Sequence, residues 1–376
     1  MTLAAAERLD DAALLETADT ANMLRQVASA AAQVRAAARA ATDADLGGLL
    51  AGGRPRAIVV TGMGGSGIAG EVLAAVAGPG CPVQVTTVHD YRLPGWVGAA
   101  DLVIAVSCSG GTEETLSAAG EAVRRGCRLL GVGSPGSPLA ALAEQARAGF
   151  IEVQPSGMPR SMVWGLSVPL VVSAARLGIL AMPEQAYESA AAELERVAHL
   201  CRPDSEAFVN PAKTLALDLS GALPMIWGTS PLAGVAAARF ANQLYENGKY
   251  PAIAGVLPEA NHNQVVVFDG PFAAVPDAAA AGAAGEDQEP PVPLRLVLLR
   301  DTREHPQVAR RREESARIAA ERGIEVTELA AAGDQPLERL ASLVQLIDYA
   351  SVYLAIANGI DPAPIAAIQE LKARIA

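Results

Sequence analysis

Two short loops carry the residue types that bind phosphate without a basic side chain. The first, Gly62-Met-Gly-Gly-Ser-Gly67, leaves backbone N–H groups accessible at the start of a following helix. The second, Ser107-Cys-Ser-Gly-Gly-Thr112, brings three hydroxyls and two glycines to one turn. Hydroxyls and backbone N–H groups at a helix start can together coordinate the oxygens of a phosphate. The sequence therefore predicts a phosphorylated ligand at these loops. The expected binding residues are Gly64, Gly65, Ser66, Ser107, Ser109 and Thr112.

The glycine-rich loop on its own has three interpretations. Its Gly-x-Gly-x-x-Gly pattern between a strand and a helix matches the dinucleotide fingerprint, but the acid that would hold a ribose, Asp90, lies late for that role. The glycines could instead form only a tight turn, or hold a smaller phosphorylated or sugar ligand. The second loop favours this last interpretation. Helix capping explains one Ser or Thr at a helix start, but it does not explain the whole group.

The charge of the chain excludes one class of partner. Its 376 residues include 41 acidic and 29 basic side chains, which gives a net charge of −12. Binding to DNA or RNA needs a basic surface, so no nucleic-acid partner is expected. A small phosphorylated ligand needs only a few local donors and stays compatible with this charge.

Composition also bears on cofactors and location. The cysteines are too few and too scattered for a disulfide framework or a CxxC metal site. No cofactor is expected. The first residues show no basic region before an apolar core, which predicts no signal peptide. The longest apolar stretch, around 162–182, is interrupted by Pro169 and Arg176, so no membrane span is expected. We therefore expect a cytoplasmic protein.

Alternating strands and helices position both loops. A β-branched run at 57–61 precedes the glycine-rich loop, and a second run at 102–107 ends in the hydroxyl-rich loop. Such runs, each followed by a helix, are typical of buried parallel strands. Further strands are expected at 83–88, 129–132 and 150–153. The pattern predicts an α/β fold with a doubly wound parallel sheet.

The second half of the chain repeats this arrangement. Strands are expected at 225–228, 265–268, 294–299 and 325–329, with helices between and after them. The predicted organisation has four parts: a helical segment at 1–46 that packs on the first domain, a first α/β domain at 47–155, a second at 156–376 with C-terminal helices, and a low-complexity insertion at 273–292.

Several motifs together resemble the bifunctional phosphoglucose/phosphomannose isomerase family. Besides the two loops, they are the loop Pro155–Arg160, the segments Asn242-Gln-Leu-Tyr-Glu-Asn-Gly-Lys-Tyr-Pro251 and Pro258-Glu-Ala-Asn-His-Asn263, and the C-terminal Gly359-Ile-Asp-Pro362 and Leu371-Lys372. The resemblance runs from about residue 57 to the C-terminus, apart from the insertion. It implies two sugar isomerase (SIS) domains and a homodimer. It also implies conversion of glucose 6-phosphate to fructose 6-phosphate, and it leaves open whether mannose 6-phosphate is a second substrate.

The resemblance also implies four catalytic residues. Aldose–ketose isomerisation moves a proton between C2 and C1 through a cis-enediolate, and it needs a carbon base, ring-opening groups and a stabiliser of negative charge. Glu246 is in the position of the family's base, and His262 and Lys372 match its ring-opening groups. Arg160 would stabilise the enediolate. In related isomerases the histidine comes from the neighbouring subunit, so the dimer would share its active sites across the interface.

Each of these residues has a plainer interpretation. Glu246 could be a solvated carboxylate at a helix end, and His262 a core histidine. Lys372 could be a solvated terminal lysine, and Arg160 part of a surface ion pair. The remaining histidines match nothing in the family and are expected to be structural or exposed. They are His89, His199 and His305.

The chain departs from the family pattern at Ile365 and Gly111. Related enzymes carry a small hydroxyl side chain seven residues before the lysine, which helps to accept mannose 6-phosphate, and here that position is Ile365. We therefore predict a preference for the glucose epimer. Gly111 stands where an asparagine is common. An SIS-type regulatory protein without efficient turnover is the main alternative, while a nicotinamide-dependent oxidoreductase leaves the hydroxyl-rich loop unexplained.

Overall fold

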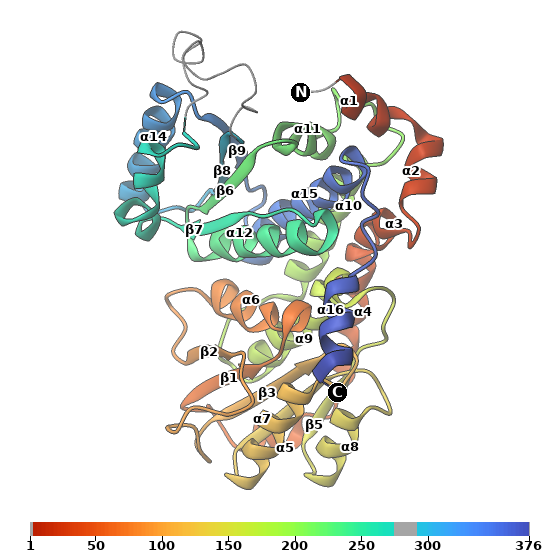
Figure 1. Ribbon diagram of the computed structural model, residues 1–376. Helices are drawn as coiled ribbons and strands as arrows, with labels where there is room; N and C mark the ends of the chain where they lie inside the picture. Colours follow the sequence, from red (N-terminus) through yellow and green to blue (C-terminus); the bar gives the residue numbers. More distant parts are fainter. Residues whose placement is uncertain (1–2, 274–291, 376) are drawn as a thin grey trace. The chain divides into compact units, whose positions relative to one another are not determined.

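The computed structural model describes residues 3–273 and 292–375, and two separate parallel sheets form its framework (Figure 1). Both sheets confirm the predicted α/β fold with parallel strands. The insertion predicted at 273–292 lies outside the described residues, apart from its two end positions.

The first sheet has the strand order β2-β1-β3-β4-β5. Its strands are β1 (Ala57–Thr61), β2 (Gln84–Val88), β3 (Leu102–Ser107), β4 (Arg128–Gly133) and β5 (Gly149–Glu152). Every residue of β1 and β3 is buried, as their β-branched sequences predict. The chain leaves β1 toward β2 and leaves β3 toward β4, so the winding direction reverses between β1 and β3. Ligands of open α/β sheets bind beside the carboxyl ends of the strands at such a switch point.

Helices cover both faces of the first sheet (Figure 1). On one face lie α4 (Ala30–Asp43), α6 (Ile68–Ala77) and α9 (Val163–Arg176). On the other lie α7 (Glu113–Arg124) and α8 (Pro138–Gln145), while the short helix α5 (Gly47–Ala51) contacts β4. Alanines of α7 pack with Val59 and Val103 into a hydrophobic core that fixes the loops at the carboxyl edge.

The second sheet has the order β7-β6-β8-β9. Its strands are β6 (Leu223–Gly228), β7 (Ile253–Val256), β8 (Leu294–Arg300) and β9 (Glu325–Ala330). The helix α12 (Pro231–Gln243) packs against β6 and β7. The helix α14 (Pro306–Glu321) connects β8 to β9.

The prediction of a strand at 265–268 in the second sheet is wrong. The run at 265–268 forms the 3-10 helix η5 (Gln264–Asp269), and the short segment β7 pairs with β6 instead. A short apolar run does not distinguish a strand from a helix. Here Phe268 stacks on Trp227 with ring centroids 5.5 Å apart, while Val266 is exposed. In β7, a Cβ atom at Gly255 would lie 2.5 Å from Oε1 of Gln264, so the glycine allows the Gln264 side chain to pack directly against the backbone of this strand.

Contacts between residues divide the chain into two units. Unit 1 comprises residues 1–27, 196–333 and 339–376, and unit 2 comprises 28–195 and 334–338. The predicted boundary near residue 155 differs from this division, because α9 packs against α4 and α6 and therefore belongs with the first sheet. Each unit is described below by itself.

The N-terminal segment predicted as helical contains four helices. They are α1 (Leu3–Asp10), α2 (Ala12–Ala18), α3 (Met23–Ala28) and α4. Only α4 belongs with the first sheet, so the prediction that all of 1–46 packs on the first domain differs from the structure. Within unit 1, Gln345 donates to the carbonyl of Val27, and Thr20 donates to Asp361. These bonds explain why the first helices group with the second sheet.

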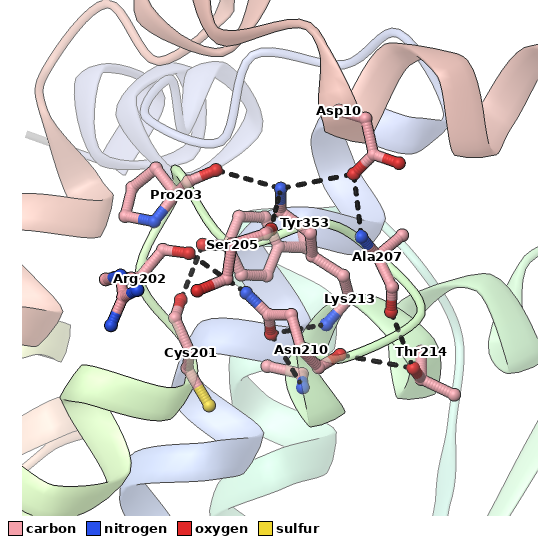
Figure 2. A network of polar contacts seen from close by, with 11 residues as sticks. Asp10, Cys201, Arg202, Pro203, Ser205, Ala207, Asn210, Lys213, Thr214 and Tyr353 are labelled. Atoms are coloured by element: carbon pink, nitrogen blue, oxygen red, sulfur yellow. Dashed lines mark hydrogen bonds and ion pairs between the residues drawn. The ribbon is translucent and has the colours of Figure 1, made fainter.

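A buried lysine ties α1 to α11 (Pro211–Leu219), as Figure 2 shows. Only 1% of Lys213 is exposed, and its Nζ donates to the carbonyls of Pro203 (2.9 Å) and Ser205 (2.7 Å). The Asp10 carboxylate lies 3.5 Å from this ammonium and also accepts from the backbone N–H of Ala207. Burial lowers the pKa of Lys213, and the charge of Asp10 opposes that shift.

Further helices in the described part of the second half are α10 (Glu184–Leu200), α15 (Pro336–Ala357) and α16 (Ala366–Ile375). Among the described residues, α15 alone is long and apolar enough to cross a membrane, and 94% of its most apolar window is buried inside the protein. That burial is typical of a core helix.

Candidate functional site

The glycine-rich loop lies at the carboxyl end of β1, beside the switch point. Gly64 has a φ of +52°, which side-chain-bearing residues rarely adopt, and Gly64–Ser66 forms the 3-10 turn η1. The Ser66 hydroxyl accepts a hydrogen bond of 3.1 Å from the backbone N–H of Cys108. The two predicted phosphate loops are therefore joined directly.

The hydroxyl-rich loop follows β3. The hydroxyls of Ser107 and Thr112 lie 2.9 Å apart, so one of them donates to the other and the second keeps its proton for a ligand. Ser109 is exposed, and its hydroxyl accepts from the N–H of Gly111. Thr112 precedes α7 but makes no capping bond through its side chain. Ordinary capping therefore does not account for Thr112, and the first turn of α7 offers its N–H groups to an anion.

Arg160 lies on a turn that contacts the glycine-rich loop. The 3-10 turn η2 (Pro159–Ser161) packs so closely on η1 that a Cβ atom at Gly65 would lie 2.8 Å from the Pro159 carbonyl. Only 3% of Arg160 is exposed, so it is not a surface arginine. Gln33 of α4 is not among the predicted residues, yet its amide nitrogen donates a hydrogen bond of 2.9 Å to the carbonyl of Ser161.

Glu246 lies on a π-helical turn, η3 (Leu244–Gly248), which directly continues α12. Single π turns occur frequently at functional sites. Residues on both sides of Glu246 are fastened to α15: Gln243 donates 3.3 Å to Asp348, and Asn247 donates 2.9 Å to Ser351. Glu246 itself is half-buried, so it is not a freely solvated carboxylate at a helix end.

A buried ion pair fixes α12, the helix that leads into the turn of Glu246. Arg239 of α12 donates Nε (2.9 Å) and Nη2 (2.6 Å) to the two carboxylate oxygens of Asp348. Both side chains are almost fully buried. Burial raises the pKa of Asp348, and the Arg239 charge opposes that shift. Two parallel bonds of this kind fix orientation as well as distance.

His262 ends the 3-10 turn η4 (Glu259–His262) and is exposed, so it is not a core histidine. Its neighbour Asn261 donates 2.7 Å to the hydroxyl of Ser315 on α14. The Ser315 hydroxyl in turn donates to the carbonyl of Arg311. The turn that carries His262 is thus attached to a long helix.

Lys372 is exposed on α16, and the half-buried Ile365 directly precedes that helix. The Ile365 carbonyl accepts from the N–H of Gln369. These two residues share unit 1 with Glu246 and His262, whereas Arg160 and both phosphate loops belong to unit 2.

The other histidines make local contacts. His89 bonds the carbonyl of Gly62 (2.9 Å) and the carboxylate of Glu71 (3.1 Å), and so it supports the glycine-rich loop. His305 caps α14, and His199 contacts Arg202. Within residues 3–273 and 292–375, no group of three or more His, Cys, Asp or Glu side chains is arranged to hold a metal ion.

Comparisons with known proteins agree with this geometry. A family model described as "Bacterial phospho-glucose isomerase C-terminal SIS domain" matches residues 208–375. Among solved structures, a hypothetical protein from Thermus thermophilus superimposes with a TM-score of 0.69 at 17% identity, covering 96% of this chain and 94% of that one. The C-terminal domain of glucosamine-fructose-6-phosphate aminotransferase from Francisella tularensis gives 0.62 at 15%, covering 91% and 98%. The SIS fold is thereby confirmed.

Curated relatives are more similar in sequence. A bifunctional phosphoglucose/phosphomannose isomerase from Caldicellulosiruptor bescii is 32% identical over 320 residues, which cover 85% of this chain and 89% of that protein. Another, from Aquifex aeolicus, is 30% identical over 84% of this chain and 89% of its own length. The chain therefore belongs to the bifunctional phosphoglucose/phosphomannose isomerase family.

Proposed function

We propose that this protein is an aldose–ketose isomerase that converts glucose 6-phosphate to fructose 6-phosphate and acts less efficiently on mannose 6-phosphate. The observation that carries this proposal is the presentation of Glu246. A carboxylate at the family's base position lies on a π turn that is fastened to α15 on both sides. A binding protein without turnover would have no need of a carboxylate held in this way.

The substrate's phosphate would bind at the switch point of the first sheet. The N–H groups that begin α7 and the hydroxyls of Ser107, Ser109 and Thr112 supply donors, and Gly64, Gly65 and Ser66 complete the site. Hydrogen bonds to a charged group are each worth about 1.5–3 kcal/mol, so a few such bonds replace a lysine.

The reaction would then proceed in two stages. His262 and Lys372 move the proton that opens the sugar ring. The Glu246 carboxylate removes the proton from C2, the electron pair forms the C1=C2 bond of the cis-enediolate, and O1 takes up a proton. The protonated Glu246 then returns its proton to C1 while O2 loses its own and becomes the ketone. The positive charge of Arg160 would stabilise the enediolate oxygens.

A coupled assay tests this proposal. Fructose 6-phosphate should form from glucose 6-phosphate, with slower formation from mannose 6-phosphate. Tight binding of either sugar phosphate without turnover would instead support a regulatory SIS protein.

The free state of Cys81, Cys108, Cys127 and Cys201 supports a reducing compartment, and we propose that the enzyme works in the cytoplasm.

We further propose a homodimer in which His262 of one subunit serves the site that contains Glu246 of the other. The exposure of His262 within its own chain is compatible with this role. Glu246→Gln and His262→Ala proteins, each inactive, should recover activity when mixed under subunit exchange, because each mixed dimer holds one intact site. A strictly monomeric active enzyme would contradict the proposal.

A further inference from the structure

Lys249 is exposed, and its ammonium group contacts backbone carbonyls from two distant segments of unit 1. Its Nζ lies 3.0 Å from the carbonyl oxygen of Glu246 and 3.2 Å from that of Asn247. It also lies 3.1 Å from the carbonyl oxygen of Asp361 and 3.0 Å from that of Pro362. One side chain therefore joins the turn that carries Glu246 to a segment more than a hundred residues later in the chain.

The backbone of Lys249 is held in an uncommon conformation. Its φ of 51° and ψ of 36° lie in the left-handed region, which lysine rarely adopts, and its N–H donates to the carbonyl of Leu244, the first residue of the π turn. Such conformations persist only where surrounding contacts impose them, and they gather at functional sites. The four carbonyls supply these contacts.

A lysine suits this place for chemical reasons. An ammonium has three N–H donors and no acceptor, so carbonyl oxygens at a helix end accept its hydrogen bonds, and the negative end of the helix dipole attracts its charge. Methionine has similar length but cannot donate, and arginine keeps the charge and the donors in a larger, planar group.

The second segment leads to two further residues of the proposed site. Asp361 and Pro362 precede Ile365 and then α16, which carries Lys372. The Asp361 side chain accepts from Thr20 (2.6 Å) and from the N–H of Ala363, so this segment is itself well anchored.

We infer that Lys249 is a positioning residue, which fixes the turn of Glu246 against the segment that leads into α16. The inference rests on the proposed function, because it assumes that Glu246 is the carbon base and Lys372 a ring-opening group, and that catalysis needs their positions to be fixed. A displacement of about 1 Å at a reacting group can cost roughly 100-fold in rate, so a small loosening should be measurable.

The test compares the wild type with Lys249→Met and Lys249→Arg. For Lys249→Met we expect kcat with glucose 6-phosphate to fall by roughly 10- to 100-fold, while KM changes by less than about threefold, since the phosphate loops are untouched. Lys249→Arg should recover part of the loss. Amide hydrogen exchange in 244–250 and 361–366 should quicken in Lys249→Met and return toward the wild-type rate in Lys249→Arg.

Lys213→Met is the matched control. Lys213 also donates to backbone carbonyls, but it ties α1 to α11 and has no part in the proposed site. This variant should lower the unfolding temperature and leave kcat unchanged. A Lys249→Met enzyme with wild-type kcat and wild-type exchange in both segments would overturn the inference. If Lys249→Met does not fold, a folded Lys249→Arg variant with unprotected segments and wild-type kcat would overturn it equally.

Failure of the proposed function can be distinguished from failure of this inference. If the wild type lacks isomerase activity, the function fails, and hydrogen exchange still reports whether Lys249 joins the two segments. If the wild type is active and Lys249→Met behaves like it, only the inference fails.

Discussion

The two sheets have the same kind of switch point but fill it differently. At the carboxyl ends of β1 and β3 lie glycines, hydroxyls and the uncapped start of α7. At the corresponding place between β6 and β8, the carboxylate of Asp301 accepts from the Ser230 hydroxyl (2.8 Å) and from Arg339 Nε (2.7 Å). Asp301 also donates its backbone N–H to the hydroxyl of Thr229.

The difference separates fold from function. The first switch point keeps hydrogen-bond donors available to an anion, whereas the second already holds an anion of its own, because Asp301 is 3% exposed and consumes the nearby donors. The Ser230 and Arg339 donors are therefore engaged by Asp301 rather than available to a phosphate. A shared topology thus provides two places for a ligand, and local side chains decide which is used. In our proposal the switch point of the first sheet, in unit 2, binds the phosphate.

The largest expected effect tests this division of roles. Glu246→Gln keeps the size of the side chain but cannot accept a proton, so kcat should fall by about 10²–10⁴-fold. Deuterium exchange at C2 in heavy water should be lost as well. Binding of glucose 6-phosphate, measured by calorimetric titration, should stay close to that of the wild type, because unit 2 is unchanged. Near-normal exchange in this variant would show that Glu246 is not the base.

A matched pair of serines tests the contrast directly. Ser109→Ala removes a hydroxyl from the first switch point and should weaken sugar phosphate binding by about 1.5–3 kcal/mol, which is at least tenfold. Ser230→Ala removes a hydroxyl that caps α12 and donates to Asp301 at the second switch point. That change should lower the free energy of unfolding by about 0.5–2 kcal/mol and leave the affinity unchanged. Equal losses of affinity in both variants would show that the two switch points do not differ in phosphate binding.

The sequence predicted those features whose causes are local. The β-branched runs of β1 and β3 lead into loops whose residue types show their chemistry, and both were predicted at the right ends of the right strands. The run at 265–268 was misread because burial of Phe268 against Trp227 depends on a distant strand.

Contacts between residues far apart in the chain could not be predicted from the sequence for the same reason. Lys249 and Asn247 stand inside a recognised motif, but their partners lie on segments about a hundred residues away. Gln33 reaches the turn of Arg160 from a helix 128 residues earlier. Neither composition nor periodicity indicates such pairs, since each depends on how helices pack on a sheet.

The smallest expected effect concerns the choice between epimers at Ile365. Glucose and mannose 6-phosphates differ only at C2 and share one enediolate, so accepting both requires a pocket that tolerates the C2 hydroxyl in two positions. A hydroxyl turned toward isoleucine loses water without gaining a partner. Because Ile365 is only half-buried, water offsets part of this cost, and we expect about 1 kcal/mol, or roughly fivefold, against mannose 6-phosphate.

Ile365→Thr offers the missing partner and should raise kcat/KM for mannose 6-phosphate relative to glucose 6-phosphate by a similar factor. The ratio of the two specificity constants, compared between wild type and variant, cancels errors in enzyme concentration and folding. Ile365→Val is the control, because it shortens the side chain without adding a polar atom, and its ratio should stay near that of the wild type. Equal use of both sugars by the wild type would contradict the prediction. A ratio that moves as far in the valine variant as in the threonine variant would assign the preference to side-chain volume rather than to the missing hydroxyl.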